Sequence, residues 1–207
     1  MKKIVIALLV TLGCMGCEKD YFHDSGRANG KNDCSMWEFL QRDAGNWSLT
    51  VEAIRHAGLI DIFDGTNPVY KEITFFGVTD LSINQFLFKT VGQDGERIYK
   101  SVGDIPVELC RRMILSYVIP KKIMRAEVNF EIPGKLEGGT VEKTATGIDL
   151  RVFRRKSDYG SAQGEGATSL YIHATESGFI SMNASGDNKV TNGVVHSLSY
   201  KFQWVEL

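Results

Sequence analysis

The chain has 207 residues, of which 43% are hydrophobic and 24% charged, and its formal net charge is -1 at neutral pH. This balance is typical of a folded globular protein and excludes a disordered or collagen-like chain. The near-neutral charge gives no electrostatic argument for nucleic acid, so we expect no such partner. The length suits one domain of full size.

The first 16 residues have the pattern of an export signal. Lys2 and Lys3 precede an uncharged and mostly apolar run over residues 4–13, which is the order found in secretory signals. The run ends before it reaches the about 20 apolar residues of a spanning helix. We therefore expect a lipoprotein signal peptide over residues 1–16 and a protein that leaves the cytoplasm.

Small residues directly precede two cysteines at the end of this run, and the segment resembles a bacterial lipobox. Cys17 follows Gly16 and precedes a charged segment, whereas Cys14 is followed by more apolar residues. The resemblance therefore implies lipidation of Cys17, with Cys14 as the alternative site. An ordinary signal peptide with incidental cysteines is the remaining interpretation.

Residues 17–33 contain few apolar groups and predict a lipidated flexible tether. Their beginning, Cys-Glu-Lys-Asp-Tyr-Phe, resembles the charged tethers of Bacteroidetes-type surface lipoproteins. The resemblance implies attachment to the outer membrane, either exposed at the cell surface or facing the periplasm. The folded domain is expected over residues 34–207.

The first half of this domain has the periodicity of helices. A capping box at Ser35 and Glu38 begins a first helix, and a second helix, capped by Asn46 or Ser48, ends at Gly58. A third helix is expected after Thr79 and Asp80, and an amphipathic helix over residues 107–116. Between the second and third helices, the β-branched and aromatic run over residues 73–78 predicts a buried strand.

In the second half the apolar period changes to two. Residues 128–132 and 148–152 alternate apolar and polar side chains, which predicts strands. Asn192 and Gly193 form a tight-turn signal before a half-buried final strand over residues 194–204. Helices followed by strands predict an α+β fold with a mostly antiparallel sheet.

Four segments in this order resemble a fasciclin domain, a secreted and cell-surface module with a helical N-terminal part packed on a β-sandwich or wedge. They are residues 35–59, 73–87, 114–120 and 191–198. In the second segment Gly77 stands where the family usually has Ala, and in the third Tyr117 stands where the family has His. We expect the motif residues to be structural: Thr79, Asp80, Tyr117, Asn192, Gly193 and His196.

The sequence contains no pattern that predicts catalysis, a metal site or a cofactor. None of its four histidines pairs with another His or Cys at the spacing of a zinc site, and the nucleotide and nucleophile motifs are missing. Asp80 follows a strand and precedes a helix, which favours a capping role over a catalytic one. Cys34 and Cys110 could form a disulfide, but a buried thiol is the commoner outcome for Cys110.

Two short basic clusters could contact acidic glycans, sulfated polymers or phospholipid head groups. They are residues 154–156 and the group of Lys121, Lys122 and Arg125. Such clusters are usually solvated strand ends. We expect a non-catalytic adhesion or binding module, held to the membrane by its N-terminal lipid, with an unknown protein or glycan ligand. The alternative is a structural or accessory subunit of a membrane-associated nutrient-uptake or assembly complex.

Overall fold

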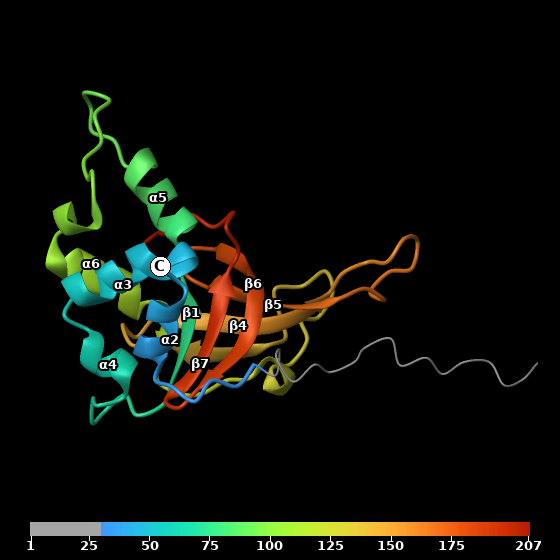
Figure 1. The fold of residues 1–207 in the computed structure, drawn as a ribbon. Helices are drawn as coiled ribbons and strands as arrows, with labels where there is room; N and C mark the ends of the chain where they lie inside the picture. The colour runs from blue at the N-terminus through green and yellow to red at the C-terminus, as the bar shows by residue number, and fades with distance from the viewer. Residues whose placement is uncertain (1–29) are drawn as a thin grey trace, which may run out of the picture.

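Helices fill the N-terminal half of residues 30–207, the part of the chain that the computed structural model describes (Figure 1). The first begins with the predicted capping box between Ser35 and Glu38. The second is followed by Gly58, whose left-handed backbone ends it as expected. The helices are α2 (Met36–Arg42), α3 (Ala44–His56), α4 (Ile60–Asp64), α5 (Asp80–Lys89) and α6 (Val107–Leu115).

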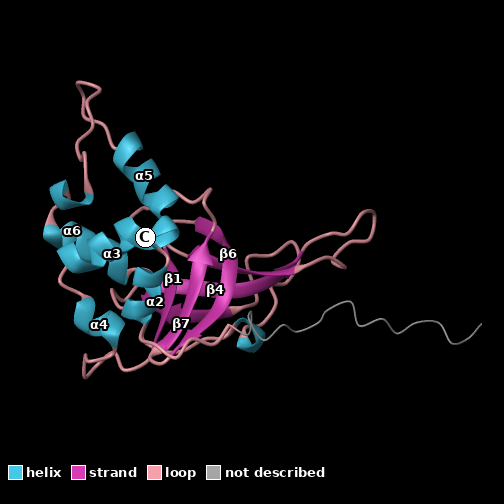
Figure 2. Cartoon of the chain, in the orientation of Figure 1, coloured by secondary structure: helices cyan, strands magenta, loops and turns pink. Residues whose placement is uncertain are grey.

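The strands form one sheet in the order β2-β1-β7-β6-β5-β4-β3. Figure 2 shows the strands of this sheet in magenta, with helices α2 to α6 gathered on one side. Within residues 30–207, β1 and β7 pair in parallel and the other neighbours are antiparallel. The predicted α+β fold with a mostly antiparallel sheet is confirmed. The strands are β1 (Ile73–Gly77), β2 (Val118–Ile119), β3 (Thr140–Lys143), β4 (Asp149–Lys156), β5 (Thr168–Ala174), β6 (Phe179–Val190) and β7 (Gly193–Leu198).

The sheet is strongly curved because β6 belongs to both of its halves. Its first residues pair with β5, its later residues pair with β7, and register shifts separate Asn183 from Asn188. Such irregularities bend a strand and increase its twist. At the other end the Ala145 N–H donates to the Val118 carbonyl at 2.7 Å. The β3–β4 turn thus reaches β2, and the sheet is nearly barrel-shaped.

The main core lies between the helices and strands β1 and β7, which are buried along their whole lengths. Trp47 of α3 lies on Gly77 of β1, where an added Cβ would be 2.5 Å from the Trp47 ring. This close contact favours a residue without a side chain at position 77. Phe63 and Phe75 meet edge to face with centroids 4.9 Å apart, a geometry that contributes about 0.5–1.5 kcal/mol beyond burial.

The folded part of the chain extends to at least residue 30, before the expected domain start at residue 34. The Asn32 N–H donates to the Lys189 carbonyl at 2.8 Å, and the Lys189 N–H donates to the Gly30 carbonyl at 2.6 Å. The last residues of the predicted tether therefore pair with β6. The predicted signal peptide and the rest of the tether lie outside the described residues.

Residues 128–132 do not form the predicted strand. Phe130 and Glu131 make isolated bridges, while the Ile132 N–H donates to the Glu137 carbonyl at 2.9 Å in a turn that contains Pro133. The alternation of apolar residues was misleading here because Phe130 and Ile132 are both exposed. They belong to a loop that folds back on itself before β3.

The last strand differs from the prediction in length and in burial. β7 ends at Leu198 and is buried along its whole length, with β1 and β6 paired along its two edges. The Phe202 N–H donates to the Ser199 carbonyl at 2.9 Å, so the chain turns after the strand. Tyr200 is exposed in this turn, whereas Trp204 returns to the core.

The helical half differs from the prediction in two places. α3 begins at Ala44, before the predicted caps Asn46 and Ser48, because the Asp43 carbonyl accepts the first helical N–H groups. α4 was not predicted, since its five residues are too few to show an apolar period.

Cys34 and Cys110 are both buried free thiols, so no disulfide joins them. Burial raises the pKa of the Cys110 thiol to about 12. Its Sγ lies 3.5 Å from the Ala53 carbonyl, and the side chain packs in the core. Cys110 therefore acts as a small hydrophobic residue.

Candidate functional site

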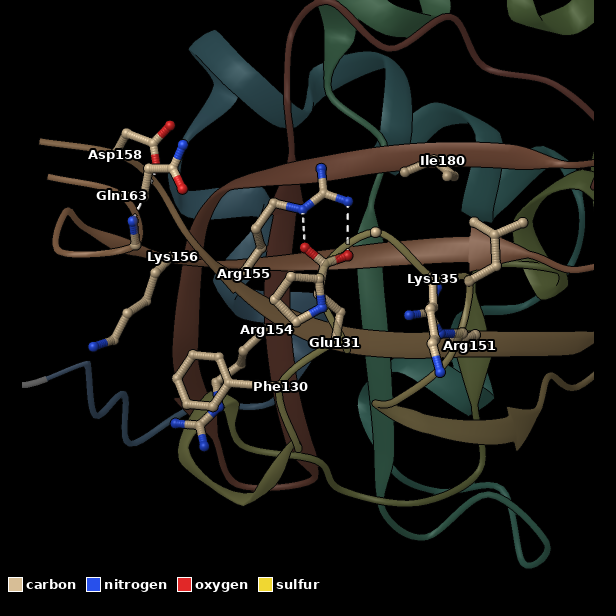
Figure 3. Close-up of a pocket in the computed structure, with 14 residues that line it drawn as sticks. Phe130, Glu131, Lys135, Arg151, Arg154, Arg155, Lys156, Asp158, Gln163 and Ile180 are labelled. Carbon is tan, nitrogen blue, oxygen red and sulfur yellow. Dashed lines mark hydrogen bonds and ion pairs between the residues drawn. The ribbon is translucent and has the colours of Figure 1, made fainter. Parts of the chain in front are cut away.

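An open pocket of about 970 Å³ lies between β4 and two loops, residues 130–136 and 158–164 (Figure 3). Ile180 of β6 completes the lining, and no lining residue belongs to a helix. The pocket is therefore built entirely by the β half of the domain.

Cationic side chains outnumber acidic ones in the lining of this pocket. Five of its 14 residues are Lys or Arg, and two are Asp or Glu. Because the chain as a whole carries a charge of -1, this positive charge is a local feature. A concave cationic site attracts anionic groups of a ligand. The charged lining residues are Lys135, Arg151, Arg154, Arg155, Lys156, Glu131 and Asp158.

Arg151 is a buried cation without a carboxylate partner among the described residues. Its Nε donates to the Gly138 carbonyl and its Nη2 to the Glu137 carbonyl, both at 2.7 Å. The guanidinium lies 4.1 Å from the centre of the Phe153 ring, and the residue is 3% exposed. Its Nη1 has no hydrogen-bond partner within residues 30–207. A buried charge held by neutral groups is costly, and a nearby anion would offset that cost.

Arg155 and Glu131 form a two-pronged ion pair that ties the 130–136 loop to β4. Arg155 Nη2 donates to Glu131 Oε2 at 2.8 Å, and its Nε donates to Oε1. Hydrogen bonding to Glu131 raises the pKa of Arg155. The guanidinium also lies 4.6 Å from the centre of the Tyr171 ring. Both carboxylate oxygens of Glu131 are thus engaged, and the loop is held in place.

Arg154 places a further cation beside an aromatic ring in the pocket wall. Its guanidinium lies 4.2 Å from the centre of the Phe130 ring, and its Nε is buried without a partner in the described part of the chain. Phe130 is 41% exposed. Lys135 and Lys156 are exposed around the same pocket. The pocket therefore combines an aromatic surface with exposed cationic groups.

His173 lies beside Arg151 on the neighbouring strand β5. Burial lowers the pKa of His173, and the charge of Arg151 lowers it further. The imidazole is therefore neutral at pH 7. Its Nδ1 is buried and has no partner among the described residues.

Thr79 and Asp80 lie at the start of α5, where Thr79 precedes the helix and Asp80 is its first residue. Thr79 is the N-cap residue of α5, but its side chain makes no capping hydrogen bond. The Asp80 carboxylate instead accepts the N–H groups of Ser48 at 3.0 Å and Leu49 at 2.8 Å. Asp80 thus joins α5 to α3, which is a structural role.

Two other motif residues, Tyr117 and Asn192, connect distant segments. The Tyr117 hydroxyl donates to the Val205 carbonyl at 2.9 Å, and burial raises the pKa of Tyr117. Asn192 accepts the Met36 N–H at 2.7 Å and donates to the Phe63 carbonyl at 2.9 Å, which joins the β6–β7 turn to helices α2 and α4.

Gly193 lies where β1 and β7 come together. Its φ is +146°, and a Cβ would lie 1.9 Å from the Ile73 carbonyl oxygen. The close pairing of these parallel strands therefore requires glycine.

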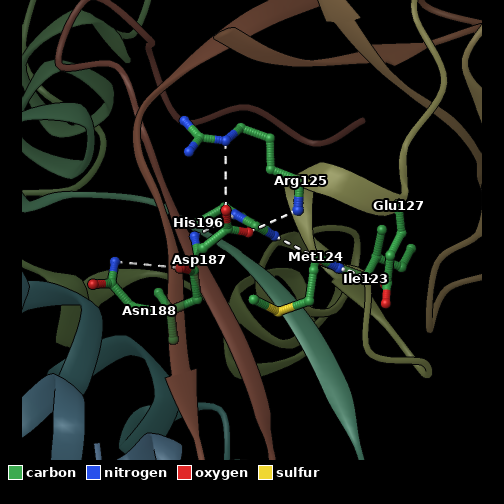
Figure 4. Close-up of polar contacts among 8 residues, drawn as sticks. Ile123, Met124, Arg125, Glu127, Asp187, Asn188 and His196 are labelled. Carbon is green, nitrogen blue, oxygen red and sulfur yellow. Dashed lines mark hydrogen bonds and ion pairs between the residues drawn. The ribbon is translucent and has the colours of Figure 1, made fainter. Parts of the chain in front are cut away.

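His196 is buried and uses both ring nitrogens (Figure 4). Its Nδ1 accepts the Asp187 N–H at 3.1 Å, and its Nε2 lies 2.8 Å from the Ile123 carbonyl. A neutral ring protonated on Nε2 satisfies both contacts. Burial lowers the pKa of His196, although its bond to Ile123 acts in the opposite direction. The residue links β7 to β6 and to the segment after β2, and it does not line the cationic pocket.

The two basic clusters have different environments. Lys121 pairs with Glu142 at 2.7 Å and Arg125 pairs with Asp187 at 3.4 Å, so this cluster is largely compensated. Residues 154–156 instead line the pocket. The sequence had favoured a solvated strand end for this cluster.

The remaining functional predictions concern the lipidation site, metal binding and membrane attachment. Both candidate lipidation residues, Cys14 and Cys17, lie outside the described residues. Within the described range, no three His, Cys, Asp or Glu residues are grouped to hold a metal ion. No helix in that range is long and apolar enough to span a membrane.

Sequence reasoning missed Arg151, Glu131 and Phe130 as pocket residues. The sequence did contain a signal for Arg151, because this charged residue stands among the apolar residues Leu150, Val152 and Phe153 of β4. The pairing of Glu131 with Arg155 had no local signal, because 24 residues separate them.

The geometry defines an α+β domain with a cationic pocket on its β half. No family model matches the chain, and no curated protein sequence matches it. Among solved structures, it is similar to a FAS1 domain pair from the insect cell adhesion molecule fasciclin I, with 17% identity and a TM-score of 0.47. The match covers 75% of this chain and 43% of the insect chain, so this chain spans less than half the length of that structure.

Proposed function

We propose that the chain is a non-catalytic binding module of the fasciclin type that acts at the cell surface. The observation that supports this function is the cationic pocket, whose wall is fixed by Arg151 and by the pair of Arg155 and Glu131. A site that is already ordered loses little conformational freedom when a ligand binds, which favours affinity.

The contacts of the acidic groups in the pocket favour binding over catalysis. Both oxygens of Glu131 accept hydrogen bonds from Arg155. Asp158 accepts the Gly164 N–H at 2.9 Å, which organises the other loop. A general acid or base must exchange a proton with its substrate. These two carboxylates instead hold the pocket walls.

Attachment of the module to the outer membrane would depend on the lipidated Cys17. One acyl chain binds a membrane weakly, so stable attachment requires the multiple acylation implied by the lipobox resemblance. We expect Cys17→Ala to move the protein from the membrane to the soluble fraction, and Cys14→Ala to leave it in place. The reverse result would assign the lipid to Cys14, and membrane retention by both variants would refute lipid anchoring.

Protease treatment of intact cells tests the orientation of the domain. Cleavage of the full chain, with a periplasmic control protein left intact, is the result expected for a surface module. Protection would contradict surface exposure and favour the accessory-subunit alternative. In that case a stoichiometric membrane partner should co-purify with the chain.

A further inference from the structure

We propose that the pocket binds an acidic polysaccharide through its carboxylate or sulfate groups. This inference rests on the proposed binding function and specifies its ligand. It follows from the charge of the pocket, from its apolar surfaces and from the hydrogen bonds that already pair the backbone groups of its wall.

The charge of the pocket selects an oxyanion. Arg151 and Arg154 each have a buried guanidinium nitrogen without a partner among the described residues, and Arg151 has no carboxylate to balance it. Planar guanidinium groups match the geometry of carboxylate and sulfate oxygens. Lys135 and Lys156, exposed around the pocket, can add further contacts to a ligand with several charges.

Apolar side chains lie among these cations. Phe130, Leu136 and Ile180 line the pocket and are 41%, 71% and 42% exposed. A ligand that fits this surface must combine apolar faces with repeated negative charges. Acidic polysaccharides have this combination, because the C–H faces of their rings alternate with carboxylate or sulfate groups.

The backbone of the pocket wall is already paired, which disfavours a peptide that would add as a strand. The Glu131 N–H donates to the Arg154 carbonyl at 3.0 Å, and the Arg154 N–H donates to the Asn129 carbonyl at 3.0 Å. The Gly139 N–H donates to the Phe130 carbonyl at 3.1 Å. An extended peptide gains affinity from free strand-edge groups, and these groups are occupied.

The shape of the site also disfavours a bilayer surface. The cationic residues line a hollow between two loops, so its walls face one another across the pocket (Figure 3). A single polymer chain can enter such a hollow, whereas a flat layer of lipid head groups contacts only its rim.

The test uses the full chain, purified in detergent, and isothermal titration calorimetry in about 0.15 M salt, where exposed charges are screened beyond about 8 Å. Polygalacturonate presents carboxylates, dextran sulfate presents sulfates, and dextran is the neutral probe. We expect binding of at least one acidic polymer and no binding of dextran. Binding of one acidic polymer alone identifies which oxyanion the pocket accepts. Polyglutamate serves as the acidic peptide probe and should bind more weakly.

A pair of double variants with equal charge change shows whether the pocket is responsible. Lys135→Ala with Lys156→Ala removes two exposed pocket cations, and Lys71→Ala with Lys201→Ala removes two exposed cations elsewhere. The pocket variant should weaken binding roughly fivefold, while the control should change it less than twofold. Arg151→Met should weaken binding roughly tenfold or more, with folding checked by circular dichroism.

Three results would overturn the proposal. They are equal binding of dextran and the acidic polymers, stronger binding of polyglutamate than of any polysaccharide, and equal losses in the pocket and control variants. Failure of all acidic polymers to bind would also overturn it. If the protease and Cys17 experiments still give the expected results, that failure would refute the polysaccharide proposal and leave the proposed surface function standing. The two proposals can therefore fail separately.

Discussion

Replacing Asn192 by Ala should destabilise the domain strongly, because one side chain satisfies two buried backbone groups from different helices. Its Oδ1 accepts the Met36 N–H at 2.7 Å, and its Nδ2 donates to the Phe63 carbonyl at 2.9 Å. Met36 and Phe63 are each 0% exposed, so water cannot replace the lost amide without a structural change. The variant therefore leaves one buried donor and one buried acceptor unpaired.

The expected loss follows from these two groups. Each buried group left without a partner costs about 1–3 kcal/mol, so the variant should lose about 2–6 kcal/mol. A domain of this size is stable by about 5–15 kcal/mol, which makes the loss a large share of the total. The variant should still fold at low temperature, where urea titration can measure its free energy of unfolding.

Asn183 provides a matched control because it is also 7% exposed, the same as Asn192. Neither its Oδ1 nor its Nδ2 has a partner among the described residues. Asn183→Leu removes an unsatisfied buried amide and should therefore be neutral or stabilising. A loss below about 1 kcal/mol for Asn192→Ala, or equal losses for the two variants, would refute the hydrogen-bond reasoning.

Three further predictions concern the motif residues. Gly193→Ala should lower the free energy of unfolding by about 3 kcal/mol or more, or prevent folding, because its Cβ would meet the Ile73 carbonyl; unchanged urea unfolding would contradict this. Tyr117→Phe should cost about 1–2 kcal/mol through loss of the bond to the Val205 carbonyl, and an unchanged thermal midpoint would count against it. His196 has a folded pKa below its unfolded value of about 6.5, so the unfolded chain takes up its proton first and stability should fall as pH drops below about 6.5. This slope in urea unfolding should shrink in His196→Gln, and an unchanged slope would assign it to other groups such as His173.

The sequence predicts the helical half of the fold well because its signals are local. A capping box lies within four residues, so Ser35 and Glu38 identify the start of α2 without knowledge of the rest of the chain. Gly58 marks the end of the second helix for the same reason. The short buried strand β1 could be predicted from its composition, since a fully buried strand needs no alternation.

The pocket could not be predicted in the same way because it depends on long-range pairing. Phe130 and Ile132 alternate with polar residues as in a strand, yet the chain turns at Pro133 and exposes both of them. The loop becomes part of a pocket because Glu131 reaches Arg155 on β4 and the loop backbone pairs with Arg154. Sequence alone indicated a basic cluster at residues 154–156 but gave no sign of what lies opposite it.

At the start of β4 the alternation of side chains separates the pocket from the main core, whereas Arg154, Arg155 and Lys156 at its end all line the pocket. Leu150 and Val152 point into the core, whereas Arg151, Phe153 and Arg155 form a second layer on the opposite face. The centre of this second layer is buried, so a change at Arg151 alters packing as well as charge.

Lys135 and Lys156 lie at the exposed edge of the same pocket and contribute charge without core contacts. Replacing the two lysines should therefore lower ligand affinity without changing stability. Replacing Arg151 should change both. For this reason the lysine pair, and not the central arginine, gives the cleaner measure of how much the pocket charge contributes to binding.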